Sequence, residues 1–132
     1  MNKVSHYLIW AARIVAAIIL FQTLFFKFSG AEESVYIFTI VGMEPWGRIG
    51  VGVMEMIASV LLLIPAISWL GAAIAVGLMA GAIGMHLTLL GIEVQGDGGY
   101  LFYLALLVTL CAGFVLWQDK EKMIGSLKKL KP

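Results

Sequence analysis

Four long apolar runs dominate this sequence and limit what the chain can fold into. They cover about residues 7–28, 47–64, 69–90 and 100–117. A helix rises 1.5 Å per residue, so runs of about 18 to 22 residues match the roughly 30 Å hydrocarbon core of a bilayer. Hydrophobic residues make up 61% of the 132 positions, and a chain this short cannot bury that much apolar surface in its own core. We therefore predict an all-α integral membrane protein with a bundle of four helices.

Basic residues lie mainly near the two ends of the chain. Four spans place both termini on one side of the membrane, and that side holds all the Lys and Arg residues except Lys27 and Arg48. The positive-inside rule then predicts a multi-pass protein of the cell inner (plasma) membrane with both termini in the cytoplasm. We divide the chain into a transmembrane domain, 1–118, and a basic amphipathic cytoplasmic tail, 119–132. The tail is expected to lie on anionic lipid headgroups of the bilayer, and nothing in the sequence indicates nucleic-acid binding.

A shorter helix is expected between the first two membrane helices. Residues 31–41 contain a run of apolar and aromatic side chains that ends before Gly42, a residue typical of helix ends. Ser29 and Glu32 have the spacing of a capping box at its start. We expect this helix to lie in the outer interface of the membrane and to cover the bundle.

Small residues in the third apolar run predict close helix packing. Ala73, Gly77 and Gly81 recur at intervals of four, and such a stripe lets another helix approach the backbone closely. The spacing leaves open whether that neighbour is the first helix, the fourth helix or a second protomer of a homo-oligomer.

The chain has few residues that could hold a metal or an intrinsic cofactor. Cys111 is the single cysteine, so the paired thiols needed for disulfide exchange are missing. His6 and His86 fall at opposite ends of the predicted bundle and cannot ligate one haem between them. Zinc would need more ligands than His86 and scattered carboxylates. We expect no metal site and no intrinsic cofactor.

Charged side chains inside the apolar runs are the candidate functional residues, because an ionised group deep in a bilayer is costly unless it is paired or hydrated. Arg48 and Glu55 are seven residues apart and so share one face of the second helix. Antiparallel spans bring the outer ends of the first and third helices to the same depth as these residues. We predict a ligand-binding pocket in the outer half of the bundle that contains Lys27, Arg48, Glu55 and His86.

Other polar residues are assigned structural roles: Arg13, which is expected to lie alone near the inner boundary, Gln22 and Ser59. A structural alternative also remains open for the pocket residues. Lys27 and Arg48 can extend to the outer headgroups, or either can pair with Glu55 to hold the helices in register. The sequence identifies no catalytic residue.

Several segments together resemble the DoxX family of small four-helix membrane proteins. They are Arg13 early in the first helix, "KFSG" at its end, "GVMEMIASVLLLIP" in the second helix, and Met79, Ala82 and His86 in the third. The resemblance covers about residues 13–117. It implies a membrane subunit linked to quinone-dependent or sulfur redox metabolism, with Arg13, Lys27, Glu55 and His86 as its polar signature. A bound quinone and a separate redox partner subunit are therefore expected.

Two other classes of function remain open on the sequence. A non-catalytic membrane scaffold or assembly factor would use the charged residues only to hold its helices together. A small proton-coupled transporter would use Glu55 to exchange protons. Small multidrug exporters place that glutamate in the first helix and lack a strong charge bias, whereas this chain has Glu55 in the second helix and a strong bias.

Overall fold

The computed structural model describes residues 2–130, which are helical apart from turns and the loop 91–99. The α-helices are α1 (Lys3–Ser29), α2 (Glu32–Ile40), α3 (Trp46–Leu62), α4 (Ser68–Met85), α5 (Tyr100–Gln118) and α6 (Lys120–Lys129). A 3-10 turn, η1 (Pro65–Ile67), precedes α4, and a π-helical segment, η2 (His86–Leu90), continues it. The described residues contain no β-strand, so the predicted all-α class is confirmed for this part of the chain.

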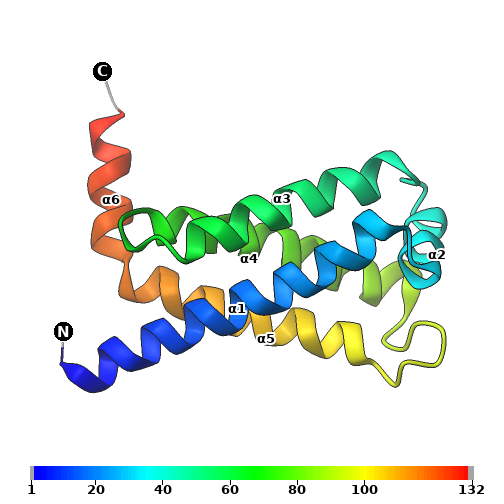
Figure 1. Ribbon diagram of the computed structural model, residues 1–132, viewed down its shortest axis with the longest axis horizontal. Helices are drawn as coiled ribbons and strands as arrows, with labels where there is room; N and C mark the ends of the chain where they lie inside the picture. Colours follow the sequence, from blue (N-terminus) through cyan, green and yellow to red (C-terminus); the bar gives the residue numbers. More distant parts are fainter. Residues whose placement is uncertain (1, 131–132) are drawn as a thin grey trace.

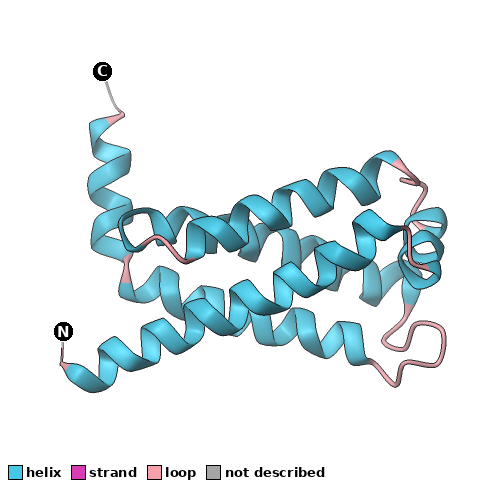
Figure 2. Cartoon of the chain, in the orientation of Figure 1, coloured by secondary structure: helices cyan, strands magenta, loops and turns pink. Residues whose placement is uncertain are grey.

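The four longest helices lie side by side and run alternately in opposite directions (Figure 1). α2 lies across one end of this group, and α6 projects across the other end, where both chain termini are found (Figure 1). Short turns join most helices, while the longer loop between η2 and α5 lies near α2 (Figure 2). We refer to the two ends of the molecule as the α2 end and the α6 end.

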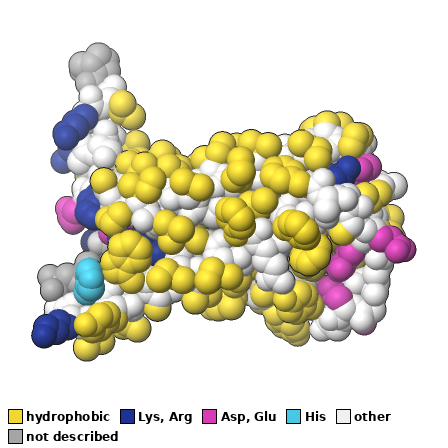
Figure 3. Space-filling model, viewed as in Figure 1, with side chains coloured by type: hydrophobic (Ala, Val, Ile, Leu, Met, Phe, Trp, Pro, Cys, Tyr) yellow, Lys and Arg dark blue, Asp and Glu magenta, His cyan; other side chains and the backbone are white. Residues whose placement is uncertain are grey.

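The long helices carry the apolar surface expected of a membrane protein. Among residues 2–130, three segments are long and apolar enough to cross a bilayer: Lys3–Ser29, Pro65–Leu90 and Tyr100–Gln118. Hydrophobic side chains cover the middle of the face shown in Figure 3, and charged side chains gather toward its two ends. α3 is shorter, with 17 residues, and contains both Arg48 and Glu55. The protein is therefore an α-helical membrane protein with three clear candidate spans.

Small side chains form much of the core between the long helices. Fully buried alanines occur on α1, α3, α4 and α5: Ala16, Ala58, Ala72, Ala75 and Ala112. The closest backbone approach involves Gly71 on α4, where an added Cβ would lie 2.6 Å from the Leu62 nitrogen and 2.8 Å from the Ala58 oxygen. α4 thus packs directly against the backbone of α3.

Within the described part of the chain, no other helix packs against Gly77 and Gly81, so the alternatives of the first or fourth helix are not met and packing against a second protomer stays a prediction. A Cβ added at either position would have no neighbouring atom within 4 Å. Both residues instead line a pocket. Their spacing matches a packing stripe, but no helix of the described chain occupies the space in front of them.

The short helix α2 occurs where the sequence predicts it, but the predicted capping box does not form. Ala31 occupies the N-cap position and makes no side-chain capping bond. α1 extends to Ser29, whose hydroxyl donates to the Phe26 carbonyl at 3.3 Å. Ser29 therefore belongs to the last turn of the preceding helix. Gly42 has φ +77° just beyond the end of α2, in agreement with its predicted role as a helix stop.

Replacing Gly71 with alanine should destabilise the protein, because the new Cβ would press on two backbone atoms of α3. We expect Gly71→Ala to lower the free energy of unfolding by about 1 to 3 kcal/mol, measured by thermal unfolding in detergent. Gly77→Ala is the matched control on the same helix, since its Cβ meets open space and alanine favours helix. Equal melting temperatures for the two variants would contradict the close α3–α4 contact.

Candidate functional site

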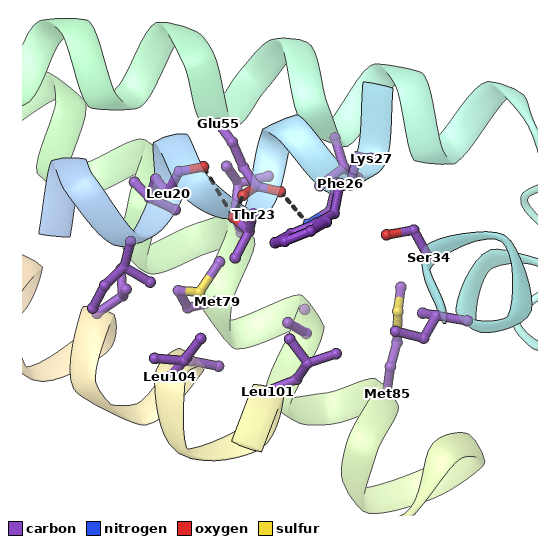
Figure 4. A pocket seen from close by; sticks show the side chains of 18 of the residues that line it. Leu20, Thr23, Phe26, Lys27, Ser34, Glu55, Met79, Met85, Leu101 and Leu104 are labelled. Carbon is purple, nitrogen blue, oxygen red and sulfur yellow. Dashed lines mark hydrogen bonds and ion pairs between the residues drawn. The ribbon is translucent and has the colours of Figure 1, made fainter. Parts of the chain in front are cut away.

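A pocket of about 420 Å³ lies toward the α2 end of the molecule, between α1, α2, α4, η2 and α5. α3 contributes Val51 and Glu55 to its wall. Figure 4 shows a largely apolar lining in which Leu20, Met79 and Leu104 lie across from one another. The volume is within the range of about 300 to 1,000 Å³ that is usual for small-molecule sites.

Glu55 is almost fully buried on this wall, with 1% of its surface exposed. Nζ of Lys27 lies 2.7 Å from its Oε1 atom, and the hydroxyl of Thr23 donates to its Oε2 atom (Figure 4). Among the described residues, Oε1 receives no hydrogen bond of good geometry, so its contact with the ammonium is chiefly electrostatic. The pair links α1 to α3 and offsets the cost of burying each charge.

His86 also lines the pocket and is 5% exposed. It is the first residue of η2, and π-helical turns are often found at functional sites. Its Nδ1 atom lies 2.9 Å from the Gly91 carbonyl oxygen. A carbonyl can only accept, so Nδ1 carries a proton toward Gly91, and in the tautomer with that single proton Nε2 is an acceptor. The ring also packs edge-on against Phe102, with 5.5 Å between centroids.

The structure does not place Arg48 in the pocket, contrary to the expectation from the sequence. Its Nε atom lies 3.0 Å from both carboxylate oxygens of Glu44, one turn earlier. Its Nη1 atom donates to the main-chain carbonyl of Lys27 at the end of α1. Arg48 therefore connects the ends of α1 and α3, and Glu55 pairs with Lys27 alone.

The prediction that Arg13 lies alone is wrong. Its Nη2 atom lies 3.1 Å from Oδ2 of Asp119, and the two side chains are 5% and 3% exposed. The guanidinium carbon is also 4.9 Å from the centroid of the Trp10 ring. Asp119, which the sequence assigns to the tail, is buried at the junction of α5 and α6. One sequence signal could have predicted this ion pair. Asp119 is the first charged residue after the last apolar run, and it lies at the same end of the bundle as Arg13.

Gln22 and Ser59 differ in their surroundings. Ser59 is buried, and its hydroxyl donates to the Met56 carbonyl at 2.9 Å. Gln22, for which we expected a structural role, is exposed and lines the pocket. Phe26 of α1 and Tyr100 of α5 are also exposed lining residues. At these three residues the lining of the pocket reaches the surface of the molecule.

The sequence predicted that apolar side chains of α2 cover the pocket, and Ile37 and Phe38 do line it, but it did not identify the polar residues that α2 contributes. Glu33 and Ser34 both line the pocket, and Figure 4 shows the Ser34 hydroxyl directed toward its interior. Burial raises the pKa of Glu33, and the charge of Asp97 together with a hydrogen bond to it raises that pKa further. The position of α2 over the predicted pocket was the only signal for these residues.

Asp97 belongs to the loop beside α2. Burial alone would raise its pKa, but donors in the main chain and the nearby His86 together lower it. The donors are the amides of Val94 at 3.0 Å, Gly99 at 2.8 Å and Leu101 at 3.3 Å. Within residues 2–130, no group of three or more His, Cys, Asp or Glu side chains is arranged to hold a metal ion.

Comparison of the chain with protein-family models, curated proteins and solved structures gives no match. The resemblance to the DoxX family therefore stays a prediction. The function has to be inferred from the geometry of the pocket.

Removing the carboxylate of Glu55 should leave the Lys27 ammonium without its counter-ion in apolar surroundings. We expect Glu55→Leu to cost about 3 kcal/mol or more of unfolding free energy. Glu55→Gln should cost less, because an amide can still accept from Thr23. Thermal unfolding in detergent measures both effects, with the exposed Glu32→Gln as the control for loss of a carboxylate. Unchanged stability of Glu55→Leu would argue against the buried pair.

Proposed function

We propose that α1, α3, α4 and α5 all span the inner membrane, with α2 in the outer interface and both termini in the cytoplasm. α3 lies alongside α1 and α4 (Figure 1), and at 1.5 Å per residue it is about 26 Å long. Lys120, Lys122, Lys128 and Lys129 lie on α6, whereas the α2 end carries Glu32, Glu33, Glu44, Glu93 and Asp97. This asymmetry supports an α6 end that faces the cytoplasm.

A topology reporter fused after Pro132 tests this orientation. We expect a reporter that is active only in the cytoplasm to be active there, and one that requires export to be inactive. The same two reporters fused within the loop 91–99 should give the reverse pattern. Activity of the export-dependent reporter at the C-terminus would place the pocket in the opposite leaflet.

The pocket supports a binding function for a membrane amphiphile, and we propose a quinone. The observation that carries this proposal is an apolar cavity of about 420 Å³ with a Lys27–Glu55 ion pair on its wall. A quinone head is a flat apolar ring with two carbonyl oxygens, and the ammonium of Lys27 can donate to one of them. The exposed side formed by Gln22, Phe26 and Tyr100 gives such a molecule a path from the surrounding lipid.

Under this proposal the chain is a quinone-binding subunit of a redox complex. It has one cysteine and two histidines, and the histidines lie on α1 and η2, at opposite ends of the bundle. We therefore assign electron transfer to a partner subunit. In this chain, Lys27 and Glu55 would position the head of the quinone, and the apolar wall would exclude water from it.

A scaffold or assembly factor is the second candidate, and the placement of the two buried ion pairs favours it. Arg13–Asp119 ties α1 to the α5–α6 junction, and Lys27–Glu55 ties α1 to α3 fourteen residues later. Such pairs can fix helix register without any ligand. In that case lipid chains would fill the pocket, and no quinone would bind selectively.

Ligand binding separates these two functions. We expect a short-chain quinone at saturating concentration to raise the melting temperature of the purified protein, since a ligand at 100 times its Kd adds about 2.7 kcal/mol. Gly81→Leu should abolish most of that rise, because its side chain would project into open space in the pocket.

Gly50→Leu provides the matched control for this experiment. Gly50 is exposed on α3 and does not line the pocket, and a Cβ added to it would likewise have no neighbouring atom within 4 Å. This variant should keep the full rise in melting temperature. If wild-type protein shows no rise, or if the two variants respond alike, the scaffold function replaces the quinone site.

A further inference from the structure

The polar atoms around the pocket include acceptors that can take a further hydrogen bond. Oε1 of Glu33 is buried and receives no hydrogen bond from the described residues, whereas Oε1 of Glu55 faces the Lys27 ammonium at 2.7 Å. Because Nδ1 carries the proton toward Gly91, Nε2 of His86 is a second acceptor whenever the ring holds a single proton. A buried acceptor that lost its water without gaining a donor costs about 1 to 3 kcal/mol. An occupant with O–H groups would remove that cost.

Cations are scarce around the same space. Among the described residues that line the pocket, Lys27 is the one Lys or Arg, and Glu55 already balances its charge. Arg48, the nearest guanidinium, is held by Glu44 outside the pocket. The carboxyl groups of Glu33 on the wall and Asp97 beside it share a hydrogen bond, and because no described Lys or Arg on the pocket wall balances them, this pair leaves the α2 end of the pocket with a net negative charge. This field disfavours an anionic head and favours positively polarised hydrogen atoms.

We propose that the pocket preferentially binds the reduced, dihydroxy form of a quinone, with Glu33 as the residue that selects it. This inference rests on the proposed function, since it specifies which form of the amphiphile the site prefers. A hydroquinone carries two O–H donors, whereas the oxidised form has only carbonyl acceptors. One hydroxyl can donate to Glu33 and the other to Glu55 or His86.

The residues that line the pocket are arranged to hold a hydroquinone ring in this position. Figure 4 shows Thr23, Lys27 and Glu55 meeting on one side, with Ser34 of α2 directed toward the same space. Ser34 can donate to, or accept from, either form of the ring, so it does not discriminate between them. Met79, Leu101 and Leu104 line another part of the pocket and would contact the apolar part of the hydroquinone.

Three probes with the same ring and side chain test the proposal on the full-length protein in detergent. They are a short-chain benzoquinone, its hydroquinone kept reduced under anaerobic conditions, and the dimethyl ether of that hydroquinone, which cannot donate. We expect calorimetry to show the hydroquinone binding about tenfold more tightly than either other probe, as one hydrogen bond to a charged acceptor would give. Glu33→Gln should reduce that preference several-fold. Glu32→Gln, the same change at an exposed neighbour on α2, should leave it intact.

Each outcome of these measurements tests a different part of the proposal. Binding of the benzoquinone as tightly as the hydroquinone, or tighter, overturns the preference for the reduced form and leaves the quinone site in place. Equal affinities for the hydroquinone and its dimethyl ether also overturn it, because the O–H donors would then contribute nothing. If Glu32→Gln and Glu33→Gln reduce the preference for the hydroquinone equally, Glu33 is not the residue that selects it. Absence of binding by all three probes rejects the proposed function together with this inference.

Discussion

The ion pair between Lys27 and Glu55 is the interaction on which the α2 half of the molecule depends. The charged atoms are 2.7 Å apart, and Glu55 is 1% exposed, so neither group could be left without the other at this depth. The pair connects α1 to α3 directly. α4 and α5 contribute further side chains to the wall of the pocket.

The two halves of the molecule are built differently. Toward the α6 end, alanines, the backbone contact at Gly71 and the pair between Arg13 and Asp119 bring the helices close together. Toward the α2 end, Gly77 and Gly81 carry no side chain to fill the space in front of them. Tight packing at one end holds the helices in place, so the other end can keep a cavity without losing its shape.

The sequence predicted the helices because apolar runs and helix-stop residues are local signals. The same kind of signal predicted α2 and the helix stop at Gly42. The sequence also predicted that Glu55 needs a partner, since a carboxylate at that depth has few alternatives. The sequence could not show whether Lys27 or Arg48 is that partner, because the answer depends on Arg48 pairing with Glu44 in the folded protein. Spacing alone could not separate Gly71 from Gly77 either. What distinguishes them is the atoms that another helix places nearby.

A purely structural role explains the pair but not the rest of the pocket. Two side chains suffice to fix the register of α1 and α3, and apolar residues of similar volume often serve as well as a buried ion pair. The buried Oε1 of Glu33 lies on α2 rather than on either of those helices, and it has no donor among the described residues. Keeping such an acceptor beside Asp97 costs stability. That cost is offset when a molecule with hydrogen-bond donors occupies the pocket, which is why we favour a binding site over a scaffold.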